Sequence, residues 1–190
     1  LLCLPAVGAD KKPLTKEESA KIIEAEIRYE LNKPTGELTK ADWEKVTKLG
    51  LYGKELTEVP KGLEKLAQLT EVNLTRNQLT SVKGLEKLTK LKWLKLYDNK
   101  LTSVKGLEKL TQLKYLFLHD NQLTSVKGLE KLTQLKYLYL MYNQLTDVKG
   151  LEKLTQLTRL HLQGNPALTK AQIDQLKKAL PKCEIVSDHD

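Results

Sequence analysis

The chain has 190 residues, of which 40% are hydrophobic and 29% are charged, and its formal net charge at pH 7 is +8. This composition is typical of a globular protein, and the length allows one sizeable core or one elongated stack. After residue 9 the sequence holds a single cysteine, Cys183, and no apolar run near the ~18 residues of a membrane span. That part therefore excludes an intramolecular disulfide framework and a membrane-spanning helix.

The first segment, 1–9, is uncharged and ends in Val-Gly-Ala, the small-residue spacing that a signal peptidase requires. We interpret it as the remnant of a signal peptide, so that the mature chain begins at Asp10. A disordered apolar end is the alternative. Cys3 follows the bulky Leu2, which disfavours a lipoprotein because no small residue precedes the cysteine.

Residues 10–45 predict a helical N-terminal cap. Thr15 and Glu18 stand at the spacing of a capping box, in which each side chain bonds the backbone N–H of the other residue. Three apolar residues then fall on one face of the predicted helix: Ile23, Ile27 and Leu31. A second short helix is expected to begin at Thr39, and its Trp43 would cover the first repeat.

A repeat of 22 residues occupies 46–168, because shifting the sequence against itself by that interval aligns four full copies. The four copies begin at Leu69, Leu91, Leu113 and Leu135. A weaker copy begins at Val46 and a partial one at Leu157. A strand and turn of this size cannot bury its leucines alone, so the copies must stack on one another.

Each full copy carries the pattern L-x-x-L-x-L-x-x-N-x-L, or Val in place of one leucine, and the sequence resembles the leucine-rich repeat family. The resemblance implies an α/β solenoid, a horseshoe with a parallel β-sheet on its concave side. The helical segment before the repeats resembles the N-terminal cap of bacterial internalin-like proteins. The resemblance also implies a structural ladder of buried asparagines at the ninth position, hydrogen-bonded to neighbouring backbone. These are Asn77, Asn99, Asn121, Asn143 and Asn165.

Residues 169–190 predict a helix-strand C-terminal cap and a short tail. Thr169 and Gln172 form a second capping-box pair. The apolar stripe of the predicted helix consists of Ile173, Leu176 and Leu180. The segment K-C-E-I-V would then return as a closing strand. Its Cys183 is interpreted as a small buried hydrophobic residue, with a free reactive thiol as the alternative.

The copies differ at positions 3, 5, 7 and 8, whereas the residues from position 11 onward barely change. In a strand, positions 4 and 6 face the core, positions 3, 5 and 7 face the open concave side, and position 8 lies at its rim. Eight of the ten aromatic residues fall at these variable positions. The sequence therefore predicts a partner-binding surface there. Its residues are Trp93, Tyr97, Tyr115, Phe117, His119, Tyr137, Tyr139, Met141, Tyr142, Arg159 and His161.

Two causes could place aromatic residues on an open face. Rings on adjacent strands can stack and contribute ~0.2–1 kcal/mol per pair to the sheet. Alternatively they form a docking surface, since Trp and Tyr are enriched at binding hot spots and solenoids commonly bind on their concave side. The concentration of aromatics on the middle three copies favours recognition as the main cause, with stacking as a contribution.

The positive charge lies mainly away from the predicted binding surface, whose charged residues nearly cancel. Lysines and glutamates alternate on the convex side, in the repeated K-G-L-E-K segments. We interpret the convex side as a solvated face, and attraction to an anionic envelope is the alternative. We expect no nucleic-acid partner.

No sequence motif indicates catalysis, because no HExxH, nucleophile elbow or phosphate loop is present. Asp98 and Asp120 occupy the same position in consecutive copies, beside His119. A weak cation site is the alternative there, but solvated carboxylates are expected. The sequence predicts a protein that is not an enzyme and has no cofactor and no metal.

These observations predict a monomeric, exported bacterial protein, secreted, periplasmic or at the cell surface, that binds a protein ligand on its concave face. One alternative is an intracellular regulatory subunit resembling the leucine-rich regulators of phosphatase 1, if segment 1–9 is retained. The other is a structural or adhesive envelope component held by its basic convex side.

Overall fold

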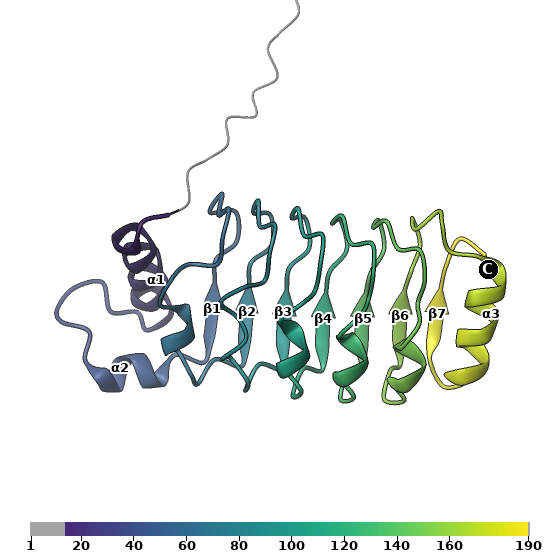
Figure 1. The fold of residues 1–190 in the computed structure, drawn as a ribbon. Helices are drawn as coiled ribbons and strands as arrows, with labels where there is room; N and C mark the ends of the chain where they lie inside the picture. Colours follow the sequence, from purple (N-terminus) through teal and green to yellow (C-terminus); the bar gives the residue numbers. More distant parts are fainter. Residues whose placement is uncertain (1–13, 190) are drawn as a thin grey trace, which may run out of the picture.

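The structure, a computed structural model, describes residues 14–189, so the predicted signal-peptide remnant 1–9 and the expected start at Asp10 lie outside the described residues. Within 14–189 seven short strands form one parallel sheet, in chain order and with open edges (Figure 1). The strands are β1 (Lys48–Gly50), β2 (Glu71–Asn73), β3 (Trp93–Lys95), β4 (Tyr115–Phe117), β5 (Tyr137–Tyr139), β6 (Arg159–His161) and β7 (Glu184–Val186). This sheet confirms the predicted leucine-rich repeat solenoid.

On the convex side, four of the connections between successive strands within 14–189 contain a short 3-10 helix. These helices are η1 (Leu63–Lys65), η2 (Leu107–Lys109), η3 (Leu129–Lys131) and η4 (Leu151–Lys153). The glycine before each of them is left-handed, as at Gly150 with φ 101°. A Cβ added at Gly150 would lie 3.2 Å from the Cβ of Glu130 in the preceding repeat. These glycines therefore adopt a backbone conformation that residues with a Cβ rarely adopt.

The N-terminal end of the sheet is covered by two helices, α1 (Lys16–Glu30) and α2 (Lys40–Lys45). The Thr15 hydroxyl accepts from the Glu18 N–H at 3.1 Å, and the Glu18 carboxylate accepts from the Thr15 N–H at 2.7 Å, which completes the predicted capping box. Buried Ile23 and Ile27 join the leucine core, with Trp43 partly buried against it.

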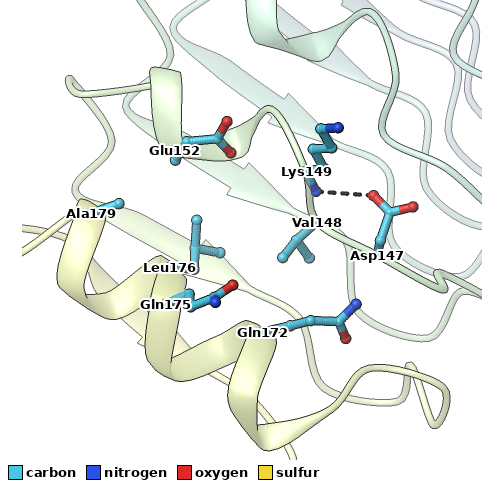
Figure 2. A pocket seen from close by; sticks show the side chains of 8 residues that line it. All are labelled: Asp147, Val148, Lys149, Glu152, Gln172, Gln175, Leu176 and Ala179. Carbon is cyan, nitrogen blue, oxygen red and sulfur yellow. Dashed lines mark hydrogen bonds between the residues drawn. The ribbon is translucent and has the colours of Figure 1, made fainter.

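The C-terminal end is covered by α3 (Lys170–Ala179) and closed by β7, which pairs with β6. The Gln172 side chain accepts from the Thr169 N–H at 2.8 Å, as the capping-box spacing predicted. Figure 2 shows α3 opposite the loop of the last full repeat, with Leu176 and Val148 in the space between them. Both side chains are almost fully buried, so the helix seals the end of the stack.

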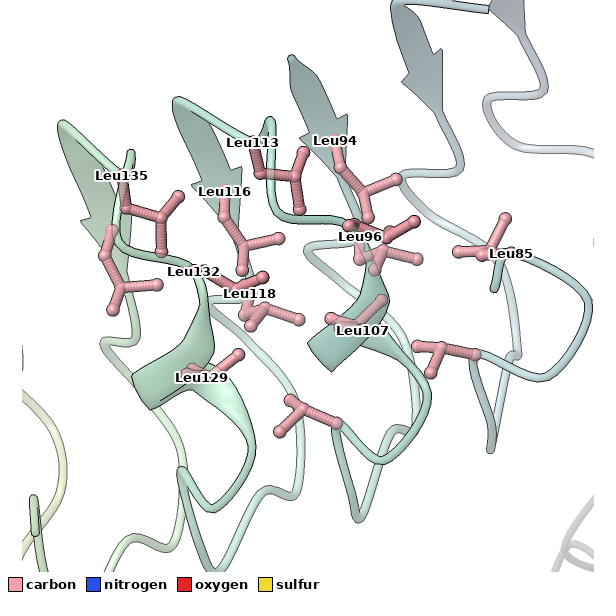
Figure 3. Packing of buried hydrophobic residues seen from close by; sticks show 14 of the residues in the cluster. Leu85, Leu94, Leu96, Leu107, Leu113, Leu116, Leu118, Leu129, Leu132 and Leu135 are labelled. Atoms are coloured by element: carbon pink, nitrogen blue, oxygen red, sulfur yellow. The ribbon is translucent and has the colours of Figure 1, made fainter. Parts of the chain in front are cut away.

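Leucines fill the space between the sheet and the convex helices. Figure 3 shows Leu94 and Leu116 on neighbouring strands directed toward Leu107 and Leu129 on the 3-10 helices. All four are fully buried, and each repeat supplies the same set. Burial of such a side chain contributes roughly 1.5–3 kcal/mol, so the stacked repeats share one continuous core.

The five asparagines at the ninth position lie inside the turn that follows each strand. The Asn99 side-chain amide donates to the carbonyl of Leu96 in its own repeat and to that of Leu74 in the preceding one, both at 3.0 Å. Its side-chain oxygen accepts from the Leu79 N–H at 3.0 Å. The same three contacts recur at Asn77, Asn121, Asn143 and Asn165. Each amide thus satisfies backbone groups that burial would otherwise leave unpaired.

Candidate protein-binding surface

The middle residue of each strand faces the core, and its two neighbours face the open side, which we call the concave face. In β4 the central Leu116 is fully buried, while Tyr115 and Phe117 are half-buried on the open side. The parallel register aligns equivalent residues of successive strands, such as Tyr115 with Tyr137. Side chains at one position of the repeat therefore form columns that run across the strands.

The first column, at position 3, is a continuous stack of side chains. The Trp93 and Tyr115 rings stack with centroids 3.6 Å apart, and Tyr115 meets Tyr137 edge to face at 5.1 Å. The Arg159 guanidinium lies 5.5 Å from the Tyr137 ring centre. Its Nε is 3.3 Å from the Glu184 carboxylate on β7. Ring stacking, a cation–π contact and an ion pair thus hold the column in place.

The second column, at position 5, runs parallel to the first. Phe117 meets Tyr139 edge to face, with ring centroids 5.1 Å apart. Tyr139 then lies against His161 at 4.4 Å. These rings are half-buried between the two flanking columns. Together with the first column they make a contiguous aromatic surface over β3 to β6.

The third column, at position 7, lies just beyond the ends of the strands. His119 stacks on Tyr97 with centroids 4.2 Å apart and lies 6.3 Å from Tyr139, while half-buried Met141 occupies the next repeat. Burial lowers the pKa of His119 below its usual 6.5, an effect that Asp120 and Asp98 oppose. The buried Nδ1 of His119 has no hydrogen-bond partner.

Tyr142 stands at the rim and is the most exposed of the predicted binding residues, with 61% of its surface accessible. Its backbone is left-handed, with φ 54°, which is strained for an aromatic residue. Gly164 occupies the same position in the next repeat, and a Cβ added there would overlap the Tyr142 ring. The glycine thus leaves room for this tyrosine.

The N-terminal part of the concave face carries ion pairs in place of stacked rings. The Glu71 carboxylate lies between Lys48, at 3.8 Å, and Lys95, at 3.6 Å. Arg76 pairs with Asp98 at 3.4 Å. The Arg76 guanidinium thus offsets the charge of the Asp98 carboxylate.

One residue at an open-face position is not accessible. Thr75, at position 7 of its repeat, is fully buried, and its hydroxyl has no hydrogen-bond partner. The prediction of an open position was wrong here. Tyr52 and Tyr97, which have much larger side chains, occupy the same position in the repeats on either side. The alternation along a strand predicts which side of the sheet a side chain faces, but it does not predict the size of the side chains next to it.

The eleven predicted binding residues lie on the same side of the sheet, but most of them are not freely exposed. Trp93 is 37% accessible and Arg159 and Tyr142 are also exposed, whereas the other eight are half-buried against one another. Stacking between repeats therefore accounts for part of the aromatic pattern. The half-buried rings still keep part of their surface accessible to solvent.

Two features outside the concave face bear on chemistry. Cys183 is half-buried, less covered than predicted, and burial raises the pKa of its thiol to about 11. A thiol that stays protonated is a poor nucleophile, which argues against the reactive alternative. Among residues 14–189, no three His, Cys, Asp or Glu side chains lie where they could hold a metal ion, and no helix is long and apolar enough to cross a membrane.

Sequence reasoning did not predict the open cavity of about 570 Å³ between α3 and the last full repeat (Figure 2). Its lining comprises Asp147, Val148, Lys149, Glu152, Gln172, Gln175, Leu176 and Ala179. The one local signal is Asp147, which replaces the serine of the three preceding copies. The carboxylate accepts from the Lys149 N–H at 3.0 Å, as Ser125 does from Lys127 at 3.1 Å. The substitution therefore preserves the turn.

Comparison with known proteins places the repeat in a family. The family model described as leucine-rich repeats (2 copies) matches residues 89–132 and 133–178. The chain is a leucine-rich repeat protein. No curated protein sequence is significantly similar to it.

Three of the solved structures similar to this leucine-rich repeat protein come from bacteria. A leucine-rich repeat protein of Leptospira interrogans is 34% identical, with a TM-score of 0.70 over 76% of this chain and 38% of its own. An internalin of Listeria monocytogenes, inlF, is 25% identical, with a TM-score of 0.68 over 88% of this chain and 56% of its own. Internalin C2 of the same species, at 20% identity and TM-score 0.57, shares the fold over 87% of this chain and 92% of its own.

The fold is therefore internalin-like, as the resemblance in the sequence implied. The chain spans about half or less of the length of the first two of these proteins. A leucine-rich repeat solenoid of this kind is a protein-interaction module.

Proposed function

We propose that this leucine-rich repeat protein is a non-catalytic, exported binding protein that recognises a protein partner through its aromatic concave face. The observation that carries the proposal is the contiguous surface of Trp93, Tyr115 and Tyr137 beside Phe117 and Tyr139. Rings that brace one another lose little side-chain freedom when a partner docks. This arrangement lowers the entropic cost of binding.

The exposed parts of these rings favour a protein over a sugar. The face of Tyr115 that would stack on a sugar is covered by Trp93 at 3.6 Å, and the Tyr97 face is covered by His119 at 4.2 Å. Other parts of these half-buried rings remain accessible. Tyrosine used in this way offers apolar area together with a hydrogen-bonding group, the combination enriched at protein interfaces.

A direct test compares two triple variants. Changing Tyr115, Tyr137 and Tyr139 to Ser removes the centre of the aromatic surface. The control changes three exposed polar residues, one from each of the three middle repeats, to Ser, namely Lys100, Gln122 and Gln144. A partner is first captured on the immobilised wild-type protein, and its affinity for each variant is then measured by calorimetry.

We expect each central tyrosine to contribute ~1–3 kcal/mol of binding free energy and the polar control residues to contribute far less. Circular dichroism and thermal unfolding establish that both variants are folded. Undiminished binding to the folded tyrosine variant would contradict the proposal and leave ring stacking as the sole role of these residues.

Export is supported by segment 1–9, whose small-residue ending suits cleavage before Asp10. We propose that the mature protein is secreted, periplasmic or at the cell surface. Mass spectrometry of the native protein tests this, because a mature N terminus at Asp10 is expected. Native protein that retains Leu4 or Pro5 would contradict export by this route and favour the intracellular phosphatase-regulator alternative.

A further inference from the structure

Three lysines form an in-register row at the edge of the sheet, where the strands β3 to β5 begin. They are Lys92, Lys114 and Lys136, each one repeat apart. The Lys114 N–H donates to the Lys92 carbonyl at 2.9 Å, and the Lys136 N–H donates to the Lys114 carbonyl at 2.8 Å. Neighbouring strands lie ~4.8 Å apart, so the backbones of these three lysines are separated by about that distance from one strand to the next.

A shallow cavity of about 400 Å³ lies between the last two lysines of this row. Its lining residues are Lys114, Thr133, Gln134, Lys136, Thr155 and Gln156. Each of the six side chains carries a hydrogen-bond donor, and none is a carboxylate. Lys114 is half-buried, which restricts its side chain more than that of a fully exposed lysine. We call these six residues the edge cavity.

The donors of the edge cavity have no partner within the part of the chain that the structure describes. No ion pair involves Lys92, Lys114 or Lys136 there. The glutamates nearest in sequence to Lys114 and Lys136 have other partners, because the Glu108 carboxylate accepts from the Gly106 N–H and the Glu130 carboxylate from the Gly128 N–H, both at 2.6 Å. Like charges on directly adjacent strands repel and destabilise a sheet. An added anion would relieve that repulsion.

We propose that the edge cavity binds a tetrahedral oxyanion, phosphate or sulfate, and that the lysine row binds successive groups of one linear polyanion. Lysine ammonium, threonine hydroxyl and glutamine amide groups are suited to donate to several oxygens of such a group. The cavity lining has no aromatic residue on which a nucleobase could stack. The ligand is thus recognised through its anionic groups. This site is separate from the concave face and does not depend on the proposed function.

The test uses the full chain and two polymers, inorganic polyphosphate and heparin, with affinity measured by calorimetry at fixed ionic strength. The variant K114Q/K136Q removes two charges from the edge cavity. The matched control K127Q/K149Q removes two charges from exposed lysines of the same two repeats, outside the cavity. The variant K114R/K136R keeps the charge at the cavity.

We expect K114Q/K136Q to weaken binding by about tenfold or more, because charged hydrogen bonds are lost, and K127Q/K149Q to weaken it far less. K114R/K136R should bind within a fewfold of the wild type. Tighter binding of polyphosphate or of heparin identifies the oxyanion as phosphate or sulfate. Equal losses of affinity in the two glutamine variants would show that net charge alone explains binding, and would overturn the proposal. Absence of binding to both polymers by the folded wild type would overturn it as well.

Discussion

On strand β4, Leu116 faces the core, whereas its neighbours Tyr115 and Phe117 face the opposite side of the sheet. The two sides differ in how much their residues vary from one repeat to the next. On the core side every full copy presents an aliphatic side chain, Leu or Val, to the same surroundings. On the concave side the copies present different residues, which meet different neighbours. The core side is therefore interchangeable between repeats, whereas the concave side gives each repeat its own surface.

The concave face itself consists of two parts that are stabilised by different contacts. Between β1 and β3 it is held by ion pairs centred on Glu71, and from β3 onward by stacked rings that begin at Trp93. Exposed ion pairs contribute little and are screened by salt, whereas ring pairs also bury apolar area. The contacts within the aromatic part are therefore expected to stabilise the sheet more than the ion pairs do.

The largest effect should come from the core side of β4. Leu116 is fully buried, so Leu116→Ala is expected to lower the free energy of unfolding by ~2–5 kcal/mol through lost contacts and the remaining cavity. Urea unfolding measures this loss. Gln122→Ala, at an exposed position of the same repeat, should stay within ~0.5 kcal/mol of the wild type. A loss for Leu116→Ala as small as that of this control would show that the repeats do not share a tight core.

The asparagine ladder should give the next largest effect. Asn121→Ala removes the side-chain oxygen that accepts from the Leu101 N–H at 2.9 Å and the amide that donates to the carbonyls of Leu96 and Leu118. We expect a loss of ~1–3 kcal/mol in the free energy of unfolding, because buried backbone groups stay unpaired. Unfolding identical to that of Gln122→Ala would contradict a structural role for the ladder.

Ring stacking on the concave face should contribute less. A double-mutant cycle on Tyr115 and Tyr137, each changed to Ser, isolates the energy of their edge-to-face contact at 5.1 Å. We expect a coupling of ~0.5–1.5 kcal/mol in the free energy of unfolding. A coupling near zero would leave partner binding as the only energetic reason for these rings.

The smallest effect should be a pH dependence that arises from His119. Burial lowers the pKa of this residue below its usual 6.5, so the unfolded chain takes up the proton first as the pH falls. The stability contribution of neutral His119 is present above ~6.5 and is lost as the pH falls through the lower pKa of the folded state. His119→Phe keeps an aromatic ring and should lose less stability between pH ~7.5 and ~5.5 than the wild type. Equal losses in the two proteins, measured by urea unfolding, would assign the acid sensitivity to other groups.

Local patterns in the sequence were enough to predict which side of the sheet each repeat position faces and where the cap helices begin. Alternation along a strand depends only on local backbone geometry, so Leu116 could be assigned to the core and Tyr115 to the open face. The Thr15/Glu18 and Thr169/Gln172 pairs predicted helix starts for the same reason, because a capping box is made within four residues.

The arrangement of side chains on the open side, in contrast, depends on contacts between repeats. The pairs Trp93/Tyr115 and Tyr115/Tyr137 have the same spacing in the sequence, yet the first pair stacks face to face and the second meets edge to face. Thr75 is buried at a position that is open elsewhere. Ring orientation and burial depend on the size and rotamer of side chains one repeat away, and no local pattern encodes those contacts. The edge cavity, assembled from two repeats, belongs to the same class of features.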